Sequence, residues 1–138
     1  MIPMYWRRAY YEEFGNSLLG ETALPGQIVS TSTTVTLTEP SYVRIIGKCY
    51  IGADDANWRW AALMIYEGVG GVTLQDASFA TAYFGGAASS DYQNSMMCLW
   101  DSGVYTAGPY VFELRARGAA ANRATARYIR WSIDVCRA

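Results

Sequence analysis

The last thirty residues of the chain constrain its fold more than any other stretch. Residues 109–118 alternate apolar and polar side chains, and one face carries Tyr110, Phe112, Leu114 and Ala116. Residues 124–135 repeat the pattern, with Ile129, Trp131, Ile133 and Val135 on one face. A period of two residues is typical of half-buried β-strands. The segment between them is short and contains Gly118 and Asn122, so we predict that the two strands form an antiparallel hairpin.

A hairpin is not stable alone in water, so the rest of the chain must supply further strands. Five other segments have strand patterns, namely residues 33–38, 42–51, 58–66, 72–84 and 93–100. The segment 58–66 is apolar on both faces, which predicts a central strand or one whose outer face is covered by a neighbouring subunit. The Cys-Trp-Cys spacing of immunoglobulin domains is missing. We therefore predict an all-β fold, a jelly-roll-like antiparallel β-sandwich of about 7–8 strands.

The first 26 residues differ from the rest of the chain. Five of the first fourteen are aromatic. Trp6, Tyr10 and Phe14 are spaced by four residues, which places them on one side of a short helical segment. We predict two parts: an N-terminal aromatic arm over residues 1–26 and a β-sandwich domain over residues 27–138. The arm either packs back on its own domain or lies on a partner, and aromatic side chains suit both roles.

The side chains that commonly carry catalysis are scarce. The chain has no histidine, which removes the commonest general base and metal ligand. Its three cysteines are far apart, which favours reduced, buried thiols over a disulfide framework. The adjacent Asp54 and Asp55 resemble a solvated turn more than a calcium loop. The predicted strands hold no Glu-x-Asp pair and the chain has no nucleophile motif, so we predict that the protein is not an enzyme and needs no cofactor or metal.

Binding is the remaining class of function. The net charge of −1 argues against nucleic acid or membrane as a partner. Arg115, Arg117 and Arg130 fall on the polar face of the predicted hairpin, where they form a positive row suited to an acidic patch on another protein or a neighbouring copy. With the aromatic arm they complete the candidate partner-binding residues: Tyr5, Trp6, Arg7, Arg8, Tyr10, Tyr11, Phe14, Arg115, Arg117 and Arg130.

One stretch resembles a known family. Residues 105–117, Tyr-Thr-Ala-Gly-Pro-Tyr-Val-Phe-Glu-Leu-Arg-Ala-Arg, and residues 127–135, Arg-Tyr-Ile-Arg-Trp-Ser-Ile-Asp-Val, resemble the closing strands of jelly-roll virion proteins of tailed bacteriophages. The resemblance is strongest over about thirty residues and extends more weakly from residue 27 onward. Jelly rolls of the tumour-necrosis-factor type share it in part.

The resemblance implies a capsid decoration or cement protein, which binds and stabilises the phage head shell. Its partners would be the major capsid protein and neighbouring copies of itself, as a homodimer or homotrimer on the capsid exterior, after synthesis in the host cytoplasm. The alternatives are a receptor- or glycan-binding tip domain of a tail fibre or spike, and a stand-alone carbohydrate-binding module that uses Trp58, Trp60 and Trp100. Under the first role, we expect deletion of residues 1–14 to abolish capsid attachment and leave the β domain folded.

Overall fold

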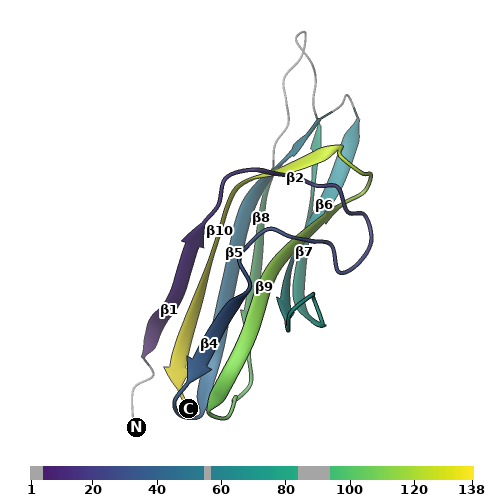
Figure 1. Cartoon of the computed structure of the whole chain (residues 1–138). Helices are drawn as coiled ribbons and strands as arrows, with labels where there is room; N and C mark the ends of the chain where they lie inside the picture. The colour runs from purple at the N-terminus through teal and green to yellow at the C-terminus, as the bar shows by residue number, and fades with distance from the viewer. Residues whose placement is uncertain (1–4, 55–56, 84–93) are drawn as a thin grey trace.

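The fold is a sandwich of two antiparallel β-sheets, seen in a computed structural model (Figure 1). The structure describes residues 5–54, 57–83 and 94–138. Within these residues there are ten strands and no helix. The predicted jelly-roll-like β-sandwich is thereby confirmed. The described residues contain no helix long and apolar enough to cross a membrane.

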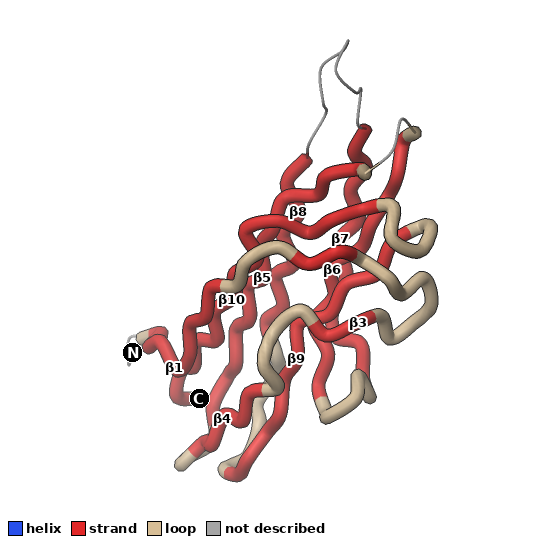
Figure 2. Tube along the Cα trace, turned by 45° about the horizontal axis from the view of Figure 1, so that its top comes forward, coloured by secondary structure: helices blue, strands red, loops and turns tan. Residues whose placement is uncertain are grey.

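Sheet A has the strand order β1-β10-β5-β8, and β2 also pairs with β10. Its strands are β1 (Trp6–Glu13), β2 (Ser17–Leu18), β5 (Ser41–Ala53), β8 (Asn94–Asp101) and β10 (Ala124–Arg137). Sheet B has the order β3-β9-β6-β7, and β4 also pairs with β9. Its strands are β3 (Gln27–Ile28), β4 (Thr33–Leu37), β6 (Trp58–Glu67), β7 (Thr73–Tyr83) and β9 (Gly108–Gly118). Figure 2 shows the two layers from a second direction.

The core lies between the sheets and follows the predicted alternation. Trp131 and Ile133 of β10 face Phe112 and Leu114 of β9, and all four are buried. Full burial of an apolar side chain of this size contributes about 1.5–3 kcal/mol to folding. The inward positions of β5, β6 and β8 complete one continuous cluster.

Strand β6 lies between β9 and β7 and is therefore a central strand of sheet B. This agrees with the first of the two interpretations of its apolar faces. Its outward residues Met64 and Tyr66 are also buried. Residues 20–26 of the same chain lie over this part of sheet B, where a Cβ at Gly26 would come within 2.9 Å of the Met64 Cε. In this part of sheet B the cover therefore comes from the chain itself.

The predicted hairpin of residues 109–118 and 124–135 is wrong. β9 belongs to sheet B and β10 to sheet A, so the two strands face each other across the core. Each pairs with strands from earlier in the chain, β10 with β1 and β5, and β9 with β4 and β6. Alternation of apolar and polar residues shows that a strand buries one face. It does not show whether two such strands pair in one sheet or face each other across the core.

The aromatic N-terminal segment forms a strand. Residues 6–13 pair with β10 from Trp6–Cys136 to Glu13–Arg130, with a β-bulge between Arg8 and Tyr10. The helical spacing predicted for Trp6, Tyr10 and Phe14 is therefore wrong. The Tyr10 ring packs edge-on against Trp131 with 6.1 Å between ring centroids. This segment therefore packs on its own domain, since β1 and β2 both pair with β10 in sheet A.

Candidate interaction surfaces

The outer face of sheet A is built in rows, because strand register places side chains of neighbouring strands at the same level. One row reads Arg8, Asp134, Arg44 and Asp101 across β1, β10, β5 and β8. Arg8 Nε lies 3.0 Å from Asp134 Oδ1 and Arg44 Nε lies 2.7 Å from Asp101 Oδ1. The hydrogen bond from Arg44 lowers the pKa of the Asp101 carboxyl. Opposite charges are thus paired along the whole row.

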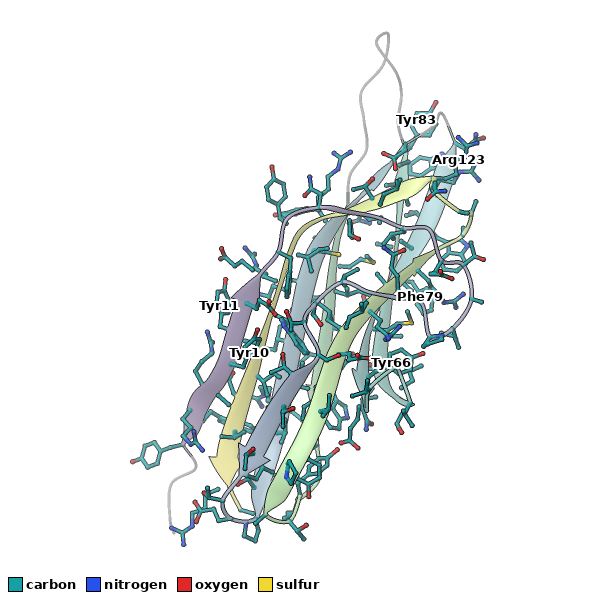
Figure 3. All side chains as sticks on the ribbon, viewed as in Figure 1. Tyr10, Tyr11, Tyr66, Phe79, Tyr83 and Arg123 are labelled. Atoms are coloured by element: carbon teal, nitrogen blue, oxygen red, sulfur yellow. The ribbon has the colours of Figure 1, made fainter. Side chains whose placement is uncertain are left out.

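Two rings on this face, Trp6 and Tyr11, belong to β1. The Arg44 guanidinium stacks over the Trp6 ring at 4.3 Å, and Arg8 lies over the Tyr11 ring at 5.4 Å. Tyr11 donates a hydrogen bond of 2.5 Å from its hydroxyl to Glu13 Oε1. That hydrogen bond, with burial and the charge of Glu13, raises the pKa of Tyr11. Figure 3 shows Tyr11 and its neighbour Tyr10 on β1.

A second row differs in charge. It reads Glu13, Arg130, Lys48 and Met97, and so sets the two cations Arg130 and Lys48 directly opposite each other on β10 and β5. Both are exposed. Like charges in this arrangement destabilise a sheet.

Tyr128 stands beside this row in an unusual backbone conformation. Its φ is 53°, and the register of β10 against β5 shifts between Arg127 and Arg130. The ring is 68% exposed and packs edge-on against Tyr50 at 6.1 Å. A bulky residue at positive φ is a marked outlier, and such outliers concentrate at functional positions.

We expect Tyr128→Gly to raise the free energy of unfolding by about 1 kcal/mol, because the left-handed conformation costs a residue with a side chain about 1–2 kcal/mol and glycine avoids most of that cost. Urea denaturation measures the change. Tyr50→Ala removes the ring that packs against Tyr128 without altering the backbone, and it should not raise the free energy of unfolding. An equal or lower stability of the glycine variant would contradict this account of Tyr128.

The outer face of sheet B carries an aromatic patch, which we define as the exposed Trp58 and Trp60 of β6 and Phe79 of β7 with the half-buried Tyr83 of β7. Trp58 stacks on Tyr83 with 5.4 Å between ring centroids, and Trp60 contacts Phe79 at 5.9 Å. Trp58 and Phe79 remain 62% and 61% exposed. Figure 3 shows Phe79 and Tyr83 on β7. Their exposure forms an apolar surface that folding of the described residues leaves uncovered.

The predicted arginine row does not form, because its members lie on opposite faces of the sandwich. Arg115 is largely buried, donates to Glu113 Oε1 at 2.9 Å and to the Gly26 carbonyl at 2.8 Å, and so stabilises the fold. Arg117 stacks over the Trp60 ring at 5.0 Å, at the border of the aromatic patch, and donates to the Thr22 carbonyl. Arg130 lies on the outer face of sheet A.

The N-terminal candidates also separate. Tyr10 and Phe14 are partly buried and pack against the core. Tyr5 and Arg7 are exposed, with Tyr5 at 76%. Trp6, Arg8 and Tyr11 share the outer face of sheet A with Arg130.

Trp100 does not join the other tryptophans named for sugar binding. It points inward and contacts Phe112 and Tyr105 at 5.9 and 6.3 Å. The candidate binding residues predicted from the sequence did not include Phe79, Tyr83, Lys48 or Tyr50. Phe79 and Tyr83 lie beside Trp58 and Trp60 because of the register between β6 and β7. That register could not be predicted from the sequence.

The described part of the chain brings no group of three or more metal-binding side chains together. Cys49, Cys98 and Cys136 are free and buried. Burial raises the pKa of the Cys49 and Cys98 thiols to about 12, so both stay protonated at neutral pH. Asp54 accepts a hydrogen bond from Thr125, and Asp55 lies outside the described residues.

Comparison with known proteins gives weak structural likeness and no match in sequence. No protein-family model matches the sequence. No curated protein matches it either. Among solved structures, the chain is similar to the structure of Eiger TNF from S. frugiperda, with a TM-score of 0.45 and 11% sequence identity over 98% of this chain and 89% of that one.

Proposed function

We propose that this chain is a non-enzymatic structural protein of a bacteriophage virion, a decoration or cement protein that binds the outside of the head shell and stabilises it. The observation that carries the proposal is the aromatic patch of Trp58, Trp60, Phe79 and Tyr83 with Arg117 at its border. Tryptophan, tyrosine and arginine are the side chains most enriched among the energetically dominant residues of protein interfaces.

The proposed mechanism is burial of the patch against the major capsid protein. Aromatic side chains each bury roughly 150–250 Å² in contacts, and their few rotatable bonds keep the entropic cost of ordering low. A ligand that binds the assembled shell and not its separated subunits stabilises the shell by mass action. The patch replaces the N-terminal segment as the proposed contact, since that segment pairs with β10.

The proposal includes self-association. A symmetric homodimer or homotrimer would present several patches to the shell, and simultaneous engagement raises avidity without new contacts. Light scattering on the purified chain measures its mass in solution.

We expect Trp58→Ala with Trp60→Ala to lower occupancy on head shells of the same phage at least tenfold, because loss of an interface residue of this class costs about 2 kcal/mol or more. Occupancy is read from the protein composition of gradient-purified particles incubated with the chain. Tyr5→Ala removes an exposed aromatic side chain outside the patch and should leave occupancy unchanged. Wild-type occupancy of the double variant would contradict the patch as the contact.

Failure of the unaltered chain to bind shells would contradict the virion role itself. In that case, adsorption of the chain to host cells would point to the receptor- or glycan-binding tip of a tail fibre or spike.

A further inference from the structure

The Lys48–Arg130 pair lies at the meeting point of two hollows on the outer face of sheet A. The first has a volume of about 300 Å³, and Tyr50, Met97 and Tyr128 are among the residues that line it. The second has a volume of about 250 Å³ and is lined by Arg8, Tyr11 and Ser132 among others. Lys48 and Arg130 line both, so the two hollows form one groove with a cationic centre.

The charge of this groove is not balanced by its own sheet. Outward positions of β1, β5, β8 and β10 hold five cations, which are Arg8, Arg44, Lys48, Arg127 and Arg130, against the three carboxylates Glu13, Asp101 and Asp134. Asp134 and Asp101 pair with Arg8 and Arg44. Glu13, which neighbours Arg130 on β1, accepts the hydrogen bond of Tyr11. The neighbour of Lys48 on β8 is Met97, so among the described residues of this face no carboxylate lies on the other side of Lys48.

Rings flank the cations on both sides. Tyr50 and Tyr128 line one hollow and Tyr11 lines the other. Hydroxyl groups accompany them, from Ser95 on the first side and Ser132 on the second. The ring of Tyr128 is held at the rim by the positive-φ conformation of its backbone.

The groove crosses the interior of the sheet. β5 and β10 each have a partner strand on both sides, so a peptide cannot be recognised here by adding a strand. A ligand must be bound through side chains alone, which are the two cations that line both hollows and the rings and hydroxyls that line each one.

We propose that this groove binds a carboxylate-bearing sugar, such as a uronic acid unit of an acidic glycan. The carboxylate lies between Lys48 and Arg130, where it relieves the repulsion of the pair and accepts charge-assisted hydrogen bonds. The adjoining sugar rings contact Tyr50 and Tyr128 on one side and Tyr11 on the other. This activity is independent of attachment to a head shell.

The test is titration of the full chain with a trimer of galacturonic acid and with its methyl ester, followed by calorimetry and by amide chemical shifts. The ester is matched in shape and lacks the charge. We expect the acid to bind and the ester to bind at least tenfold more weakly, as loss of a charged hydrogen bond predicts. Chemical-shift changes should centre on residues 48–50 and 128–132.

The variants separate a binding role from a structural one. Lys48→Gln with Arg130→Gln should weaken binding of the acid about tenfold or more and leave thermal stability equal or higher, since it removes opposed like charges. Arg137→Gln removes an arginine from outside the groove and should leave binding unchanged.

Three results would each overturn the proposal. The first is no binding of the acid, or equal binding of acid and ester. The second is binding of hexaglutamate as tight as that of the acid trimer, which would assign the groove to an acidic protein segment. The third is a change of oligomeric mass in the double variant, which would make the groove a contact between copies of this chain.

Discussion

Replacement of Glu113 by glutamine is expected to lower the free energy of unfolding by about 3–5 kcal/mol, the usual cost of breaking a buried ion pair by removing one partner. Glu113 is 1% exposed on β9. Its carboxylate accepts hydrogen bonds from the Ser32 hydroxyl, from the Gly71 amide at 2.9 Å and from Arg115 Nε at 2.9 Å. It therefore joins the loop before β4 and the turn after β6 to the centre of sheet B.

The expected loss arises because the variant leaves the Arg115 guanidinium buried without its counter-charge. Urea denaturation of the purified chain measures it. Glu39→Gln is the matched control, since Glu39 pairs with the exposed Arg137 and should cost less than about 1 kcal/mol. A loss at Glu113 no larger than that at Glu39 would show that the cluster does not stabilise the fold.

The interactions of Glu113 also predict that the stability of the fold depends on pH. Burial by itself would raise the pKa of Glu113, but the hydrogen bonds from Ser32 and Arg115, the charge of Arg115 and the Gly71 amide together hold it below its ordinary value of 4.5. The stabilisation is therefore complete above that value and is lost as pH falls through the lower pKa of the folded state. The difference in stability between the unaltered chain and Glu113→Gln should narrow below pH 4.5.

Deletion of residues 1–14 is expected to destabilise the sandwich by about 3–5 kcal/mol, the cost of removing one well-packed aromatic side chain from a core. The deletion removes β1, including Tyr10, and uncovers the Trp131 edge of the core. Domains of this size have total stabilities of about 5–15 kcal/mol, so the shortened chain should be marginally folded.

This outcome reverses the expectation that the deletion leaves the β domain intact. Thermal unfolding followed by near-ultraviolet circular dichroism measures it, because the signal reports tertiary packing of Trp131 and Tyr10. Substitution of Trp6, Arg8 and Tyr11 by alanine is the control. These side chains lie on the outer face of sheet A, so their loss should lower the free energy of unfolding by less than the deletion does. Equal stability of the deleted and complete chains would show that β1 adds nothing to the core.

The sequence predicted which faces are buried better than which strands are neighbours. Alternation over residues 109–118 and 124–135 identified Phe112, Leu114, Trp131 and Ile133 as inward-facing, and all are buried. Alternation is a local property, however, whereas pairing depends on residues far away in the chain. That is why the two strands were predicted to form a hairpin although they belong to different sheets.

The N-terminal strand was obscured by its bulge. The irregularity between Arg8 and Tyr10 changes the parity of β1, so that Trp6 and Tyr11 point outward while Tyr10 points inward. Simple alternation therefore fails across residues 6–13, and the spacing of aromatics by four resembled a helix. The aromatic patch was found only in part for a related reason, since Phe79 and Tyr83 join Trp58 and Trp60 through strand register.

The topology also makes the two ends of the sandwich different, since one end carries the chain termini and the other carries part of the aromatic patch. β1 begins beside the end of β10, through the Trp6–Cys136 pairing, so both termini of the described chain emerge at one end of the sandwich (Figure 1). Trp58 and Tyr83 pair where β6 starts and β7 stops, at the opposite end. A cargo protein or affinity tag fused to either terminus would therefore project away from the aromatic patch and leave the side chains of the patch uncovered.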